Sequence, residues 1–150
     1  MQTKQAPPMT TLCYTTNTTL KELHQFWNVT AQGIYREANR LGLDIMGPVY
    51  WSYYGVDGNP DTVFRLEISL PVSKATGQPD GFSFKRREPF HCLAALHVGP
   101  WENLPETYQR LMPTVFEQGN QPNGICREVY LNMNLEQPHY NVTEVQIGLA

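Results

Sequence analysis

The sequence has few charged residues, and this shortage argues against a protein that binds nucleic acid. Charged side chains make up 17% of the 150 residues, and the net charge is −3. A protein that binds nucleic acid needs clustered Lys and Arg to neutralise phosphates, and the only basic cluster is Lys85-Arg86-Arg87. We therefore expect no direct binding to DNA, and we interpret this cluster as part of a solvated linker.

The sequence also lacks long apolar runs and has few cysteines. No apolar run reaches the roughly 18 residues that span a bilayer, and residues 1–11 lack the apolar stretch of a signal peptide. The three cysteines, Cys13, Cys92 and Cys126, are odd in number and show no CxxC spacing, which favours reduced thiols over disulfides or a zinc site. We expect a soluble, cytoplasmic protein with no membrane segment, no bound metal and no cofactor.

The two halves of the chain match at an offset of 77 residues. The matching pairs are Gly42 with Gly119, Gly47 with Gly124, Tyr53 with Tyr130, Glu67 with Glu144, Ile68 with Val145 and Leu70 with Ile147. Each half follows the same order, which is a strand, a helix ended by glycine, a strand, a turn and a closing strand. The first strands are residues 11–16 and 90–98.

This repeat predicts a single α+β domain, residues 1–150, built from two βαββ modules related by an approximate two-fold axis. Repeat 1 covers about residues 10–72, a turn-rich linker covers about residues 73–88, and repeat 2 covers about residues 89–149. Two such modules can pair their edges into one antiparallel sheet with both main helices on one face. The groove between the modules is then free to hold a ligand.

Sequence signals mark the start of each main helix. Thr19 and Glu22 form a capping box, while Asn103 followed by Pro105 gives the second helix an N-cap and a proline in its first turn. Pro113 falls inside the second helix and should kink or split it. The apolar face of the first helix consists of Leu20, Leu23, Trp27, Ala31, Ile34, Ala38 and Leu41, and that of the second consists of Leu104, Tyr108, Leu111 and Val115.

The segment GICREVYLNMN, residues 124–134, has the alternation of a β-strand. One face carries Ile125, Arg127, Val129 and Leu131, and the other carries Cys126, Glu128, Tyr130 and Asn132. The second face holds a carboxylate two residues from an aromatic ring, with no basic residue beside it. Glu128 is therefore either solvated or part of a site.

Four motifs of the second half are HVGPW (97–101), EQG (117–119), REVYLNM (127–133) and TEVQIGL (143–149), and the first half has the weaker counterparts GPVYWSYYG (47–55) and FRLEISLPV (64–72). As a series they resemble the GyrI-like family, which includes the effector-binding domains of AraC-type and MerR-type multidrug-responsive regulators. The first 18 residues are too few for a helix-turn-helix, so we expect a free-standing effector-binding domain.

The resemblance implies two βαββ modules with a ligand cleft where they meet, and small hydrophobic, cationic molecules as ligands. In the family's multidrug binders, a glutamate of the E-x-Y strand lies at the base of the cleft and meets the positive charge. The matching residue is Glu128, followed by Tyr130. Trp51 and Tyr53 are the repeat mates of these residues and would form the opposite wall. Trp101 stands where the family often has Tyr.

Other interpretations of the same residues stay open. Glu128 could be solvated, and the aromatic residues could belong to the core. Cys126 shares the face of Glu128, but no His can be assigned as the base that a thiol nucleophile needs. Glu67 and Glu144 recur at symmetric places, which favours structural roles such as pairing with the backbone or an Arg. His97 is expected to form a hydrogen bond at the end of its strand.

Three functions are compatible with these residues. The first is the binding of small hydrophobic cations, with Glu128, Tyr130, Trp51, Tyr53 and Trp101 as the site. The second is a protein-interaction or gyrase-inhibitor-like role, which the resemblance also implies. The third is weak hydrolysis, with Glu128 activating a water molecule. Since no catalytic triad, metal cluster or phosphate loop is visible, we expect a non-enzymatic binding module.

The charge balance leads to a first prediction. The isolated chain should leave duplex DNA unshifted in a gel at submicromolar protein and physiological salt, because it lacks the basic surface that releases phosphate counterions. A shifted band that disappears on adding salt would reveal a basic surface that the sequence does not show.

Overall fold

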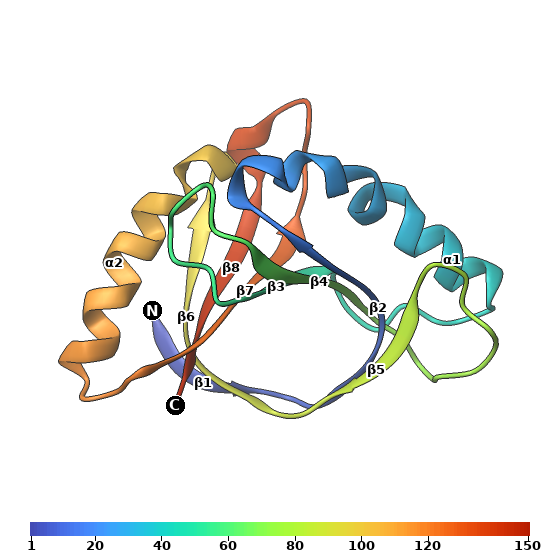
Figure 1. The fold of residues 1–150 in the computed structure, drawn as a ribbon, viewed down its shortest axis with the longest axis horizontal. Coiled ribbons are helices and arrows are strands. Elements are labelled where there is room, and N and C mark those ends of the chain that lie inside the picture. The colour runs from blue at the N-terminus through green and yellow to red at the C-terminus, as the bar shows by residue number, and fades with distance from the viewer. The chain divides into compact units, whose positions relative to one another are not determined.

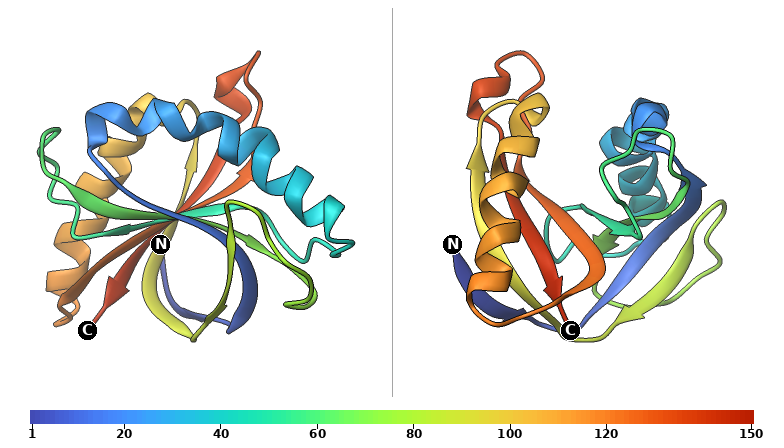
Figure 2. Two further views of the ribbon diagram at one scale, coloured as in Figure 1. Left: turned by 45° about the vertical axis from the view of Figure 1, so that its right-hand side comes forward. Right: turned by 60° about the vertical axis from the view of Figure 1, so that its left-hand side comes forward.

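The computed structural model describes residues 1–150 and divides them into two compact units. The first unit is residues 8–88, and the second is residues 1–7 together with residues 89–150. In each unit a helical segment lies on one side of antiparallel strands (Figure 1, Figure 2). The α+β class and the tandem βαββ repeat are therefore confirmed.

The first unit contains the elements of repeat 1. They are β2 (Met9–Thr18), η1 (Leu20–Phe26), η2 (Val29–Gly33), α1 (Ile34–Arg40), β3 (Tyr50–Tyr54), β4 (Phe64–Pro71) and β5 (Ser83–Arg87). The strands pair in the order β3-β4-β2-β5, and every pair is antiparallel.

The second unit contains the elements of repeat 2. They are β1 (Gln2–Ala6), β6 (Phe90–Val98), η3 (Trp101–Asn103), α2 (Leu104–Glu117), β7 (Pro122–Asn132), η4 (Pro138–Tyr140) and β8 (Val142–Leu149). The order β7-β8-β6-β1 reproduces that of the first unit, again antiparallel throughout. None of the helices in either unit is long and apolar enough to cross a membrane.

The register of the strands repeats at the predicted offset. In the first unit Trp51 lies opposite Ile68, and Tyr53 opposite Leu66. In the second unit the residues 77 positions later are again opposite each other, with Glu128 facing Val145 and Tyr130 facing Thr143. The side chains that point toward the helix in one unit therefore have an equivalent in the other.

Both main helices end in the same hydrogen-bonded turn. Gly42 and Gly119 have φ values of 70° and 77°, a region that favours glycine. Each glycine N–H donates to the carbonyl three residues earlier, and the N–H of the next residue donates to the carbonyl five residues earlier. These are the two bonds of the Schellman motif, and they confirm the prediction that the two glycines are matching helix stops.

Two short strands correct the predicted boundaries. Residues 83–87 were assigned to a linker, but they form β5 and pair with β2. Residues 2–6 form β1, which the sequence did not predict, and pair with β6. Each of these strands precedes the first strand of one repeat in the chain and belongs to the sheet of the other unit. Both are polar strands at the end of a strand order, where alternation of apolar residues is weak.

The first main helix is less regular than predicted. It consists of a 3-10 segment, a π-helical turn and a short α-helix, namely η1, η2 and α1. The Thr19 side chain makes no capping hydrogen bond, and only its carbonyl accepts from the Glu22 N–H at 3.1 Å. The capping box is therefore not formed. In the second helix Asn103 also lacks a side-chain cap bond, and Pro113 does not split α2.

Each unit packs its own apolar core between sheet and helix. In the first unit the fully buried residues include Leu12, Ile34, Leu66, Ile68 and Leu70, and in the second they include Leu93, Leu111, Val115, Val145 and Ile147. The strand members alternate along the chain, so the opposite face of each strand is free for polar groups. All three cysteines are free and buried, as expected for reduced thiols.

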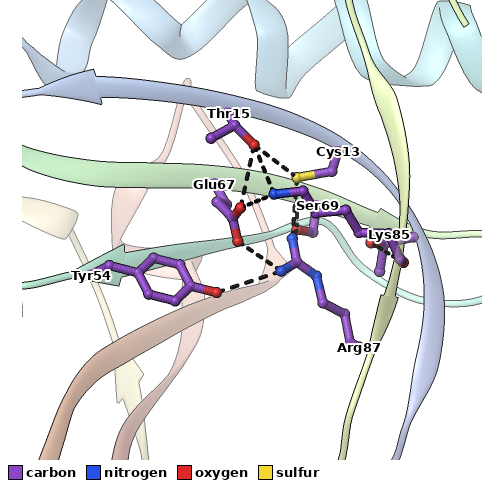
Figure 3. A network of polar contacts seen from close by, with 8 residues as sticks. Cys13, Thr15, Tyr54, Glu67, Ser69, Lys85 and Arg87 are labelled. Atoms are coloured by element: carbon purple, nitrogen blue, oxygen red, sulfur yellow. Dashed lines mark hydrogen bonds and ion pairs between the residues drawn. The ribbon is translucent and has the colours of Figure 1, made fainter.

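The opposite face of the first unit carries a buried ion cluster around Glu67 (Figure 3). Arg87 donates from Nη1 to Glu67 Oε1 at 2.7 Å, and Lys85 Nζ contacts Glu67 Oε2. Arg87 Nη2 also donates to Ser69 Oγ at 2.9 Å and to Cys13 Sγ at 3.1 Å. The structural role expected for Glu67 is confirmed, and the interpretation of residues 85–87 as a solvated linker is wrong, because Arg87 is buried.

The second unit repeats a simpler form of this contact. Glu144, the repeat mate of Glu67, pairs with Lys4 of β1 at 2.6 Å. Lys4 and Lys85 occupy equivalent positions on β1 and β5. In each unit one strand lies between the strand of the lysine and the strand of its glutamate, and both side chains are on the same face. The side chain of Glu144 is 19% exposed, whereas that of Glu67 is 1% exposed.

This difference generates a prediction about stability. Burial alone would raise the pKa of Glu67, but hydrogen bonds from Lys85 and Arg87 lower it to about 2. The change Glu67→Gln should lower the free energy of unfolding by about 3–5 kcal/mol, because it leaves a buried guanidinium unpaired. The change Glu144→Gln, at the more exposed pair, should cost about 0–1 kcal/mol in the same urea titration.

The pH dependence of unfolding gives a second measurement of the same contact. A carboxylate whose pKa is lower in the folded state stabilises the protein above its ordinary pKa and loses that effect as the pH falls toward 2. Wild-type stability should therefore fall more steeply in acid than that of Glu67→Gln. Equal costs for the two variants, or parallel acid profiles, would contradict the structural role of this cluster.

Candidate functional site

The carboxylate of Glu128 is buried in the second unit and held by two tyrosines. Its side of β7 faces α2, so it meets both its own strand and the helix. The Tyr130 hydroxyl donates to Glu128 Oε1 at 2.8 Å, and the Tyr108 hydroxyl donates to Glu128 Oε2 at 2.7 Å. Glu128 is 7% exposed. The alternative of a solvated strand residue is therefore excluded.

The sequence placed Tyr130 beside Glu128 but predicted neither of these two hydrogen bonds. Tyr130 follows Glu128 by two residues and shares its strand face. Tyr108 was placed only on the apolar face of the second helix, and its contact with Glu128 was missed. The available signal was that a tyrosine on a buried helix face needs a partner for its hydroxyl, and the facing strand offers a carboxylate.

Trp101 joins this group through its ring and its indole nitrogen. Its ring meets that of Tyr130 edge-on, with centroids 5.5 Å apart and planes at 67°. Its Nε1 donates to the hydroxyl of Thr143 at 3.1 Å, and Thr143 is fully buried on β8. Three predicted site residues, Glu128, Tyr130 and Trp101, therefore lie together in the second unit, in contact with Tyr108 and Thr143.

The other two predicted site residues lie together in the first unit. Trp51 and Tyr53 are buried neighbours on one face of β3, with ring centroids 6.3 Å apart. Tyr53 also packs against Phe64 at 5.7 Å. Trp51 Nε1 donates to the Thr30 hydroxyl at 2.8 Å. The association of this pair with Glu128 in one cleft stays a prediction.

The surroundings of the other two candidates, Cys126 and His97, favour structural roles. Burial, followed by the charge of Glu128, raises the pKa of the Cys126 thiol to about 12, so this thiol is protonated at neutral pH and is a poor nucleophile. His97 Nδ1 lies 2.8 Å from Thr107 Oγ1, and Nε2 lies 2.9 Å from the Pro100 carbonyl. His97 therefore fixes the end of its strand, as predicted. No group of three or more His, Cys, Asp or Glu side chains is arranged to bind a metal.

The geometry around Glu128 is suited to holding a positive charge. Two phenol donors orient the carboxylate, and the rings of Tyr130 and Trp101 are electron-rich groups of the kind that attract cations. The same carboxylate could also accept a proton. Charge binding and general-base chemistry are thus the two kinds of chemistry that the residues allow.

Comparisons with known proteins agree with this fold. A model of the GyrI-like small molecule binding domain matches residues 1–150. The EcmrR C-terminal domain superposes with a TM-score of 0.82 at 18% identity, over 99% of this chain and 96% of that one. The chain also covers 56% of EcmrR as seen in a complex with DNA. No curated protein sequence matches significantly.

Two further solved structures share the fold at low sequence identity. SAV2435 bound to tetraphenylphosphonium superposes with a TM-score of 0.67 at 11% identity, over 99% of this chain and 93% of that one. A hydrolase encoded by lin2189 from Listeria innocua superposes with a TM-score of 0.65 at 13% identity, over 99% and 92% of the two chains. At these identities the likeness concerns the fold.

The hydrogen bond between Tyr108 and Glu128 can be tested by its effect on stability. Tyr108→Phe removes one donor from a buried carboxylate, which should lower the free energy of unfolding by about 1.5–3 kcal/mol. In a Glu128→Gln background the same change should cost only about 1 kcal/mol, because the charge-assisted part is gone. Urea titrations of the four proteins measure the difference.

Tyr140 supplies a matched control, since it is an exposed tyrosine of the same unit. Tyr140→Phe should leave stability within about 0.5 kcal/mol. If Tyr108→Phe costs the same in both backgrounds, its hydroxyl does not interact with the charge of Glu128.

Proposed function

We propose that this chain, which belongs to the GyrI-like family of small-molecule-binding domains, binds hydrophobic cations and places the positive charge near Glu128. The observation that carries the proposal is the buried Glu128 carboxylate, fixed by the hydroxyls of Tyr108 and Tyr130, the second of which packs against the ring of Trp101. We also propose ligand contacts for Trp51 and Tyr53 of the first unit.

Burial of a carboxylate gives the site its preference for positive charge. An ionised carboxyl group taken out of water loses solvation, and two phenol hydrogen bonds offset only part of that cost. A bound cation restores favourable electrostatics to the buried charge. Each aromatic face next to the cation adds about 0.5–2 kcal/mol of attraction. The apolar parts of the ligand would be held by burial against the rings.

The two phenols also favour a particular kind of cation. Both oxygens of Glu128 already accept a hydrogen bond from a tyrosine. An ammonium ligand that donates N–H bonds would have to reach the remaining lone pairs of these two oxygens. A phosphonium or quaternary ammonium ion needs only the charge and the rings. The binding of tetraphenylphosphonium by SAV2435 supports this choice of ligand class.

The charge preference can be measured with a matched pair of ligands. Tetraphenylphosphonium and neutral triphenylphosphine oxide are titrated against wild type and Glu128→Gln, with tryptophan fluorescence as the signal. Charge-assisted contacts are worth about 1.5–3 kcal/mol, so the variant should bind the cation roughly tenfold to a hundredfold more weakly. Binding of the neutral ligand should hardly change.

Glu144→Gln is the control, since it removes a carboxylate of the same unit that pairs with Lys4. It should bind both ligands as the wild type does. Equal loss of both ligands in Glu128→Gln would assign Glu128 a structural role only. Unchanged binding of both would place the ligand elsewhere.

A hydrolytic activity is the second candidate. The observation in its favour is that two phenols hold a buried carboxylate in one orientation, as a general base would require. The fold shared with a hydrolase of Listeria innocua is compatible with it. Turnover of an electrophilic small molecule, abolished in Glu128→Gln and retained in Glu144→Gln, would favour this function over simple binding.

A further inference from the structure

Both site tryptophans donate their indole N–H to the hydroxyl of a buried threonine. Trp51 Nε1 lies 2.8 Å from Thr30 Oγ1 in the first unit, and Trp101 Nε1 lies 3.1 Å from Thr143 Oγ1 in the second. Thr30 and Thr143 are both fully buried. The two threonines are not repeat mates, because Thr30 belongs to a helical turn and Thr143 to a strand. The same tryptophan–threonine hydrogen bond therefore occurs twice, once with a threonine in a helical turn and once with a threonine in a strand.

We propose that Thr30 and Thr143 are positioning residues for ligand binding, each within its own unit, where Thr30 fixes the plane of the Trp51 ring and Thr143 fixes that of the Trp101 ring. This inference rests on the proposed function. A tryptophan ring can turn about two side-chain bonds, and a hydrogen bond at the edge of the ring selects one orientation. Attraction between a cation and a ring depends on the cation lying over the face. A ring fixed before the ligand arrives binds without paying the cost of ordering.

The surroundings of Thr30 show how this contact is built. Its hydroxyl accepts from Trp51 and donates to the Phe26 carbonyl at 3.3 Å, so both of its hydrogen-bonding functions are used. Thr30 lies in the π-helical turn η2, where the helix departs from α geometry. Trp51 is thereby connected through one hydroxyl to the backbone of the helical segment.

The second threonine is held by the sheet. Thr143 lies opposite Tyr130 on the neighbouring strand, and Tyr130 contacts both Glu128 and the ring of Trp101. Thr143 therefore fixes Trp101 against Tyr130, the tyrosine that binds the carboxylate. Because each indole N–H donates inside the protein, it is not available as a donor to a ligand, which suits ligands that carry no acceptor.

The test uses substitutions that keep the shape and remove the hydroxyl. Thr30→Val and Thr143→Val should each weaken tetraphenylphosphonium binding roughly threefold to tenfold, the size expected for loss of one hydrogen bond. Thr30→Ser and Thr143→Ser keep the hydroxyl and should bind within about twofold of wild type, which distinguishes positioning from packing.

Two buried threonines serve as matched controls. Thr107 is the repeat mate of Thr30, and its hydroxyl meets His97 instead of an indole. Thr11 is a buried strand threonine whose hydroxyl donates to the Lys85 carbonyl. Thr107→Val and Thr11→Val should reduce stability but leave tetraphenylphosphonium binding within about twofold.

A measurement on the protein without ligand tests the geometry separately. The three tryptophans give three indole N–H signals in a nitrogen-15 NMR spectrum, and Trp51→Phe and Trp101→Phe identify two of them. Thr30→Val should shift the Trp51 signal and speed its hydrogen exchange at least tenfold. Thr143→Val should do the same to the Trp101 signal, and the Trp27 signal should stay in place in both.

The outcomes separate this inference from the proposed function. If the wild type does not bind tetraphenylphosphonium, the proposed function fails, and the binding role of the threonines fails with it, whatever the indole signals do. If the wild type binds the cation and the valine variants bind equally well, the function stands and the positioning role is overturned. Serine variants that bind as weakly as the valine variants would also overturn it.

Discussion

A carboxylate buried in a protein must have partners, and this chain gives its two most buried strand glutamates different ones. Glu67 meets Lys85 and Arg87, whose charges cancel its own, and its pKa falls to about 2. Glu128 meets the hydroxyls of Tyr108 and Tyr130, which orient a carboxylate without cancelling its charge. The first arrangement stabilises a sheet. In the function that we propose, the second holds the carboxylate for a molecule that carries a positive charge.

The repeat explains how one backbone plan produces two different side-chain arrangements. Glu128 and Trp51 occupy equivalent positions on the central strands, and each is held by a hydroxyl from the helical segment of its own unit. The helix residues that do so are Thr30 and Tyr108. The residue 77 positions after Thr30 is Thr107, which directly precedes Tyr108. The two units thus differ in two side chains at this place. The strand residue is a tryptophan in the first unit and a glutamate in the second, and the helix residue that contacts it differs as well. Identical glycine stops and strand registers keep these positions aligned.

Sequence reasoning was accurate where a local pattern decides the structure. The glycine stops at Gly42 and Gly119 and the bounds of β6 follow from backbone freedom and alternation, and both were confirmed. The polar strands β1 and β5 were missed because a strand at the end of a sheet is fixed by its neighbour rather than by its own composition. The partners of Glu128 and of the tryptophans were missed for a related reason. A hydrogen bond between a helix and a strand depends on tertiary packing, which residue spacing does not encode.

The irregular first helix shows that such packing can override a local signal. A capping box and an apolar face predicted one regular helix, yet the segment passes through a 3-10 stretch and a π-helical turn. A π-helical turn gives up regular hydrogen bonds, so it persists only where tertiary contacts compensate. Here the compensation is the chain of hydrogen bonds from Trp51 through Thr30 to the Phe26 carbonyl. Departure from regular geometry thus coincides with a residue of the proposed site, as expected where function rather than stability sets the local structure.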